Sequence, residues 1–120
     1  MEEELTQAQI EELRADLLAL KEQLEGTLRG TRESARTVEL DQQSVGRLSR
    51  MDAMQQQAMA KANQQAQETR LQQVQAALRW VESGEYGLCR SCEDDIGYRR
   101  LKARPETPMC LNCQRERESQ

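Results

Sequence analysis

The chain has 120 residues, a net charge of −4 and 32% charged side chains, and its aromatic residues are one Trp and two Tyr. So few aromatics do not fill the core of a compact domain of this length, which favours long solvated helices carrying a small module. No apolar run approaches the roughly 20 residues that cross a bilayer. The acidic start Met-Glu-Glu-Glu is unlike a signal peptide, so we expect a cytoplasmic protein without membrane association.

A leucine-rich stripe predicts a first helix over residues 4–33. Thr6, or a residue just before it, is the expected N-cap. The apolar positions are three and four residues apart, as on one face of a helix: Ile10, Leu13, Leu17, Leu20, Leu24 and Leu28.

A second helix is predicted over residues 45–83, which contain no Pro and are rich in Gln, Ala, Arg and Met. Gly84 follows as its expected C-cap. We expect a register shift between Ala66 and Leu71. The apolar face is expected to begin with large residues, continue with alanines and end with large residues: Leu48, Met51, Ala58, Ala62, Ala66, Leu71, Val74, Leu78 and Val81.

The short connection, residues 34–44, and the similar length of the two stripes favour an antiparallel hairpin within one monomeric chain. Asp41 or Ser44 is the expected N-cap of the second helix. The predicted fold class is all-α and elongated. Residues 1–84 form a coiled-coil hairpin, and residues 85–120 form a zinc-finger module with a short C-terminal helix.

All four cysteines lie in two Cys-x-x-Cys pairs, Cys89/Cys92 and Cys110/Cys113, with 17 residues between the pairs. This spacing is typical of a tetrahedral four-thiolate zinc site. Two disulfides would suit a secreted chain, and a redox-active pair would suit a strand-rich βαβ context, so neither alternative is favoured. We expect one structural Zn²⁺.

The same residues argue against catalysis. The chain has no His, which excludes Ser-His-Asp, Cys-His and His-ligated metal chemistry. Four cysteines fill the four positions of zinc and leave no site for an activated water. No Gly-rich phosphate loop is present, so we expect no enzymatic activity.

Two charged clusters are candidate contact sites. The acids Glu39 and Asp41 lie in the predicted tip, and Asp52 lies farther along the second helix. These are either a solvated helix end or acidic groups presented to a partner. The second cluster lies inside the cysteine loop, where it either pairs with Glu93, Asp94 and Asp95 or contacts a partner: Arg99, Arg100, Lys102 and Arg104.

The module resembles the DksA/TraR family. The resemblance rests on three segments: Gly-Glu-Tyr-Gly-Leu-Cys-Arg-Ser-Cys (84–92), Ile-Gly-Tyr-Arg-Arg-Leu-Lys-Ala-Arg-Pro (96–105) and Cys-Leu-Asn-Cys (110–113). It implies a transcription regulator that binds RNA polymerase rather than DNA. Such a regulator inserts its coiled coil through the secondary channel and alters open-complex stability with acids at the coil tip.

The chain departs from the family at three places. The tip lacks the family's Asp-x-x-Asp-x-Ala element, so Asp41 is the first choice for the acting acid and Asp52 the second. Of the family's cations for guanosine tetraphosphate, Arg104 remains, but Gln73 and Gln114 replace two others. Each loss removes charge-assisted bonds of about 1.5–3 kcal/mol, so we expect a weak or absent response through this site. The chain also starts almost at the coil, without the separate N-terminal segment of longer members.

Two other functions remain open. A coiled-coil scaffold or adaptor with a structural zinc knob is compatible with the hairpin sequence. A zinc-ribbon nucleic-acid binder is less compatible, because residues 85–120 contain seven acids and seven Lys or Arg and therefore no basic excess.

Overall fold

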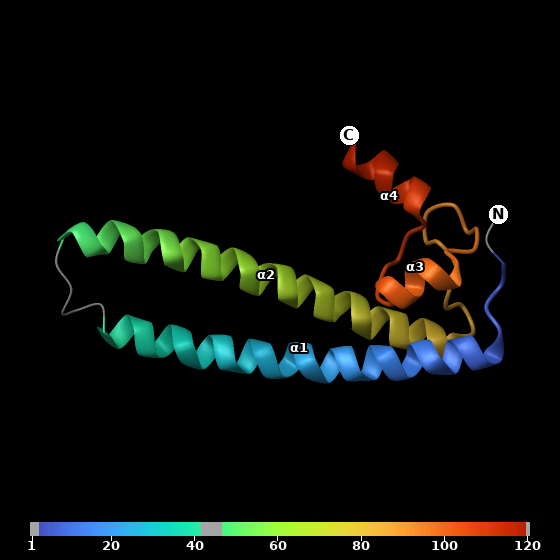
Figure 1. Ribbon diagram of the computed structural model, residues 1–120, viewed down its shortest axis with the longest axis horizontal. Coiled ribbons are helices and arrows are strands. Elements are labelled where there is room, and N and C mark those ends of the chain that lie inside the picture. The colour runs from blue at the N-terminus through green and yellow to red at the C-terminus, as the bar shows by residue number, and fades with distance from the viewer. Residues whose placement is uncertain (1–2, 42–46, 120) are drawn as a thin grey trace. The chain divides into compact units, whose positions relative to one another are not determined.

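The computed structural model describes residues 3–41 and 47–119, with side chains described except at 31–41 and 47–50. The helices of the described chain are α1 (Gln7–Asp41), α2 (Arg47–Ser83), α3 (Tyr98–Ala103) and α4 (Leu111–Glu118) (Figure 1). The predicted all-α fold, a helix pair ahead of a four-cysteine module, is confirmed.

The chain divides into two compact units. The terminal unit comprises Met1–Lys21 and Gln72–Gln120, and the middle unit comprises Glu22–Leu71. The start of α1 and the end of α2 thus group with the cysteine module, and the expected division at residue 84 stays a prediction.

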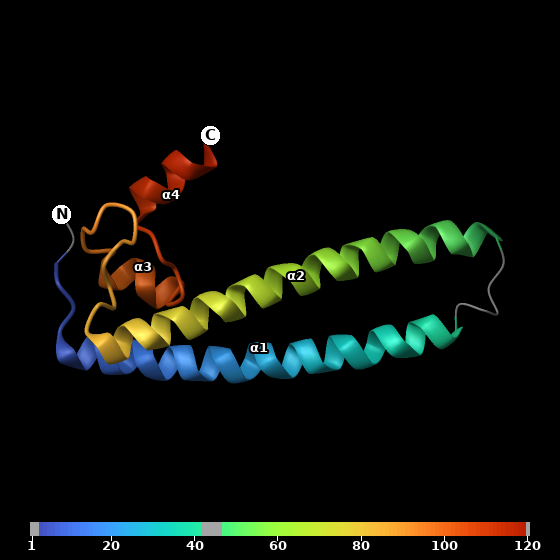
Figure 2. The same cartoon turned by 180° about the vertical axis from the view of Figure 1, so that it is seen from behind.

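The core of the terminal unit draws on helices from both ends of the chain. Leu13 and Leu17 of α1, Val74 and Ala77 of α2, and Leu101 of α3 are fully buried. Both views place the start of α1 beside the end of α2, in antiparallel directions (Figure 2). Burying each leucine stabilises the fold by about 1.5–3 kcal/mol, so the leucine stripe predicted for the first helix works as core here.

Thr6 caps the start of α1, as predicted. The Gln9 amide donates a hydrogen bond to Thr6 Oγ1 (3.2 Å), and the Thr6 amide donates one to Gln9 Oε1 (3.0 Å). This reciprocal pair is a capping box, which satisfies two amides that a helix N-terminus otherwise leaves without acceptors.

Gly84 ends α2, also as predicted. Its φ of 78° is in the left-handed region, where glycine avoids the steric penalty of a side chain. The Glu85 amide donates to the Trp80 carbonyl (2.9 Å) and the Gly84 amide to the Val81 carbonyl (3.4 Å). These two bonds form a Schellman motif, which satisfies the last carbonyls of the helix.

The middle unit has a partly polar helix contact. α1 contributes the buried Leu24 and Leu28. The partly buried positions of α2 that continue the line of Leu71 toward the N-terminus are Gln67, Gln64, Gln57 and Ala53. Their spacing of three, four and seven residues places them on one face, which we call the glutamine seam.

The predicted alanine face is therefore wrong. Ala58, Ala62 and Ala66 are exposed, and so is Met51. The face of α2 that packs on α1 is set by the line through Leu71 and Val74, and the alanines lie off that line. Leu48 and the predicted cap residue Ser44 lie outside the described side chains.

The helix boundaries at the tip also differ from the prediction. α1 continues through Gly26 and Gly30 to Asp41 rather than ending near residue 33, so most of the predicted tip 34–44 is helical. Each glycine lowers the stability of the helix by only about 1 kcal/mol relative to alanine, so a long helix tolerates both. Within the described residues, no helix is both long and apolar enough to span a membrane.

Candidate metal centre

The first cysteine pair lies in a tight turn that short backbone pairing holds closed. Leu88 and Asp95 form an antiparallel bridge. The Cys89 amide donates to the Asp94 carbonyl at 2.8 Å, and Glu93 turns the chain with a φ of 65°. The two ends of the turn are thereby fixed, and the thiols of the pair face the same side.

Backbone amides surround the sulfur of Cys89. The amides of Ser91 and Cys92 donate to Cys89 Sγ at 3.4 and 3.5 Å. Because these bonds favour a negatively charged sulfur, the turn is built to hold a thiolate. Cys89 itself is buried, whereas Cys92 is exposed.

The second pair is carried by the start of α4. Cys110 is the N-cap of this helix, and Cys113 lies in its first turn. The two halves of the module are joined by the Arg90 amide, which donates to the Pro108 carbonyl at 2.8 Å. This bond sets the second pair against the first.

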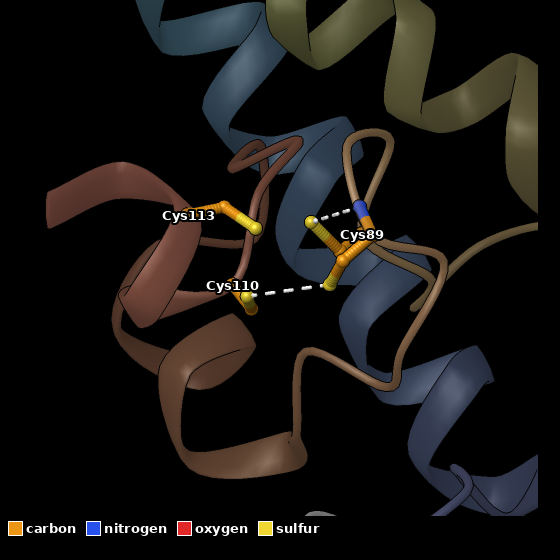
Figure 3. Close-up of side chains that lie close together, drawn as sticks. Cys89, Cys110 and Cys113 are labelled. Carbon is orange, nitrogen blue, oxygen red and sulfur yellow. Dashed lines mark hydrogen bonds between the residues drawn. The ribbon is translucent and has the colours of Figure 1, made fainter. Parts of the chain in front are cut away.

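The four sulfurs have the spacing of a tetrahedral zinc site. All four Sγ atoms lie within 4.8 Å of one another, and the Cys92 and Cys110 sulfurs are 3.7 Å apart. Zn–S bonds of about 2.3 Å in a tetrahedron give sulfur separations of about 3.8 Å. Figure 3 shows the side chains of Cys89, Cys110 and Cys113 directed toward a common centre.

The thiols influence one another's ionisation. Burial raises the pKa of Cys89, but bonds from the amides of Cys92, Cys110 and Ser91 outweigh burial and lower that pKa to about 6. Hydrogen bonding with the Cys110 and Cys92 thiols raises the pKa of Cys113 to about 12. Four crowded thiols thus resist ionising together, and a central dication removes this resistance.

The donor set fits one Zn²⁺, and these four cysteines hold it. Bound zinc supplies structural cross-linking, because four thiolates leave no open coordination position. The remaining residues of the module support the loop between the pairs. The Tyr86 hydroxyl donates to the Pro105 carbonyl at 2.9 Å, and burial, followed by the charge of Glu106, raises the pKa of Tyr86.

Two members of the basic cluster also support this loop. Arg100 donates to the Met109 carbonyl (3.0 Å) and to Thr107 Oγ1 (3.3 Å). Arg104 pairs with the fully buried Glu106 at 3.6 Å. The alternative in which the cluster pairs with Glu93, Asp94 and Asp95 does not occur in the described structure, since these two arginines contact the second half of the loop instead.

Lys102 and Tyr98 join α3 to α1. Lys102 Nζ lies 2.9 Å from Asp16 Oδ2 and 3.5 Å from Glu12 Oε1, and the Tyr98 hydroxyl donates to Glu12 Oε2. Hydrogen bonding to Asp16 raises the pKa of Lys102, and hydrogen bonding to Glu12 raises that of Tyr98. Arg99 is exposed and has no hydrogen bond or ion pair with any described residue.

Two further contacts were not predicted. Arg90 stacks on the Trp80 ring, 4.3 Å from its centroid, and lies 3.4 Å from Glu85. A Cβ on Gly87 would lie 2.8 Å from Leu5 Cδ1, so this glycine gives room to a residue before α1. In the sequence, the signal for such a close approach is Gly87 itself, which lies two residues before Cys89.

The tip acids are not assembled into a site by the described residues. Glu39 and Asp41 lie in the last turns of α1, but their side chains fall outside the described set. Asp52 is exposed near the start of α2. In the terminal unit, Gln73 is partly buried and Gln114 donates to Glu118 at 3.0 Å.

Comparison with known proteins agrees with the geometry of the cysteine module. Residues 84–119 match the family model of the prokaryotic dksA/traR C4-type zinc finger. Over these residues the chain is similar to the zinc finger of the DksA/TraR family. The four clustered cysteines are therefore its zinc ligands.

Curated relatives match the chain over a stretch of 43 residues. The RNA polymerase-binding transcription factor DksA of Escherichia coli (strain K12) is 40% identical over 43 residues, which cover 36% of this chain and 28% of that protein. The protein of the same description from Haemophilus influenzae is 35% identical over 43 residues, which cover 36% of this chain and 30% of that protein. The matched segment thus spans less than a third of these relatives.

A solved structure extends the likeness of fold beyond the DksA/TraR zinc finger. Transcription factor DksA2 from Pseudomonas aeruginosa matches with a TM-score of 0.77 and 23% identity, over 94% of this chain and 85% of that one. The helix pair and the zinc finger therefore share the fold of DksA2.

Proposed function

We propose that this protein is a transcription regulator that binds RNA polymerase directly. It inserts the tip of its hairpin through the secondary channel and alters initiation and open-complex stability. The observation that carries the proposal is the combination of a DksA/TraR zinc finger with a helix pair whose fold matches DksA2 over most of the chain. The curated relatives that match 43 residues of this chain are described as RNA polymerase-binding transcription factors.

The protein acts through geometry and charge rather than through chemistry of its own. Zinc orders the module, and its four thiolates leave no position for a substrate. It binds polymerase as a cytoplasmic monomer. It does not bind DNA, because the module has equal numbers of acidic and basic residues.

Arg99 is the main contact of the zinc finger with polymerase. The other members of the basic cluster hold the loop or α1, whereas the exposed Arg99 has no partner among the described residues. Arg100, Lys102 and Arg104 then act chiefly by placing α3, which carries Arg99, and contribute to the partner surface through their charge. Response to guanosine tetraphosphate through Arg104 is weak, since Gln73 and Gln114 supply no charge.

Asp41 is the acid that acts near the polymerase active centre, at the end of α1. Glu39 precedes it by two residues, and Asp52 lies in the second turn of α2. The test compares Asp41→Asn with Glu22→Gln, which removes the same charge from an exposed position of α1. We expect both variants to bind polymerase in a pull-down, and only Asp41→Asn to lose its effect on promoter complexes in transcription assays.

Deletion of the tip, residues 34–44, provides the complementary test. Binding retained through the zinc finger, with regulation lost, supports the proposal. A wild-type protein that neither binds polymerase nor changes transcription would leave a coiled-coil scaffold with a structural zinc knob. A shift of DNA or RNA mobility by the wild type would favour the zinc-ribbon nucleic-acid binder.

A further inference from the structure

The middle unit exposes an apolar face of α2. Met51, Met54 and Met59 are 70%, 67% and 68% exposed, and they are half of the large hydrophobic residues that are exposed in the described chain. Three of the four exposed alanines of the same region lie on the same side and complete the set: Ala58, Ala62 and Ala66. We call these six residues the methionine–alanine face.

These residues share one side of the helix. At about 100° per residue they fall within an arc of about 140°, with Met54 and Met59 at its edges. The glutamine seam lies about 180° from the centre of this arc. α2 therefore turns Gln57, Gln64 and Gln67 toward α1 and leaves the six residues of the methionine–alanine face in solvent, where Gln55 and Gln65 share the same arc.

The surroundings of the face indicate what it binds. Between Met51 and Gln67 only Asp52 and Lys61 are charged. A phosphate backbone requires a cluster of cations, and a membrane-surface helix carries basic and aromatic residues, so neither suits this stretch. An uncharged, apolar protein surface is the complementary partner.

A second copy of the chain is too small a partner. Residues 51–66 span about 22 Å of helix, and a strip about 10 Å wide on each of two copies buries roughly 450 Å² in total. Stable interfaces bury at least about 1,200 Å². This minimum area does not exclude a partner that also contacts other parts of the protein, because those contacts add to the buried area.

We propose that the methionine–alanine face is the surface by which the hairpin docks against an apolar, uncharged wall of RNA polymerase, which rests on the function proposed above. Three flexible methionines adapt to an irregular wall, and the alanines let it approach the helix backbone closely. Specificity at this contact comes from shape rather than from ion pairs.

The test is a matched pair of charge insertions in one helix turn. Ala62→Glu places a carboxylate in the middle of the face, and Asn63→Glu places the same group at an exposed position about 100° away. Both keep a good helix former, so far-UV circular dichroism of the full chain should match the wild type. Affinity for purified core RNA polymerase is measured by fluorescence anisotropy, with sedimentation of the free protein alongside.

We expect Ala62→Glu to weaken binding about tenfold or more, because the carboxylate is buried without a partner, and Asn63→Glu to weaken it less than about threefold. Wild-type affinity for Ala62→Glu, or equal losses for both variants, overturns the docking face while leaving polymerase binding intact. No binding by the wild type overturns the proposed function itself. A wild-type dimer that Ala62→Glu dissociates assigns the face to a second copy instead.

Discussion

Replacing Gln67 by leucine should stabilise the middle unit. Gln67 lies in the glutamine seam, and its Oε1 atom is buried without a hydrogen-bond partner among the described residues. Leucine has a similar size, places no polar atom in the contact, and is at least as good a helix former. The substitution therefore removes a buried oxygen that has lost its water and adds apolar surface to the seam.

The expected gain follows from the desolvation of that oxygen. A buried acceptor without a partner costs about 1–3 kcal/mol, and its removal returns an amount of this order. Because 1.4 kcal/mol is a factor of ten, amide exchange that requires opening of the middle unit should slow by about 5- to 150-fold.

Hydrogen–deuterium exchange with mass spectrometry measures this unit separately. Peptides from residues 22–71 report the effect, and peptides from the terminal unit serve as an internal reference. The matched control is Gln65→Leu, which places the same side chain at an exposed position and should change the exchange by no more than about twofold. Unchanged or faster exchange in Gln67→Leu would refute the assignment of the seam.

Three further outcomes are expected. Chelation of zinc should unfold residues 84–119 and change the fluorescence of Trp80, the only tryptophan; unchanged spectra at full metal removal would contradict a structural role. Tyr86→Phe should lower the free energy of unfolding by about 1–3 kcal/mol in urea, because the Pro105 carbonyl loses its buried donor. The raised pKa of Lys102 means that the folded state holds this proton more tightly, so its stabilisation is complete below about pH 10.5 and is lost as pH rises through the folded value. Urea midpoints between pH 8 and 12 should therefore fall less steeply in Lys102→Met than in the wild type.

The features that the sequence predicted correctly are those with short-range causes. The spacing of the cysteines determines a four-ligand set whatever surrounds it. The cap at Thr6 and the C-cap at Gly84 depend on residues within one turn of each helix end. The leucine stripe of α1 specifies its buried face because every leucine carries a large burial energy.

The face of α2 could not be predicted in the same way. Ala58, Ala62 and Ala66 have a clear period, but an alanine gains little from burial, so the period does not decide which side packs. The register is set by Leu71 and Val74 in the next turns, and it carries glutamines into the seam.

The roles of the basic cluster were equally inaccessible, since they depend on residues distant in sequence. Lys102 binds Asp16, which lies 86 residues earlier in the sequence. The six residues of α3 are too few for a periodic pattern, so the sequence does not predict that Leu101 is buried. Local patterns show that these residues are charged or apolar, but not which partner each one meets.

The composition of the terminal unit constrains the order in which the protein folds during synthesis. Leu5 packs on Gly87, and Glu12 accepts a hydrogen bond from Tyr98, so the beginning of the chain waits for residues made much later. At about 5–20 residues per second, this wait lasts roughly 4–17 s. The middle unit is continuous from Glu22 to Leu71, so all of its residues are made before Gln72–Gln120 of the terminal unit. Pairing of its helices at that stage would shorten the loop that the terminal unit must close.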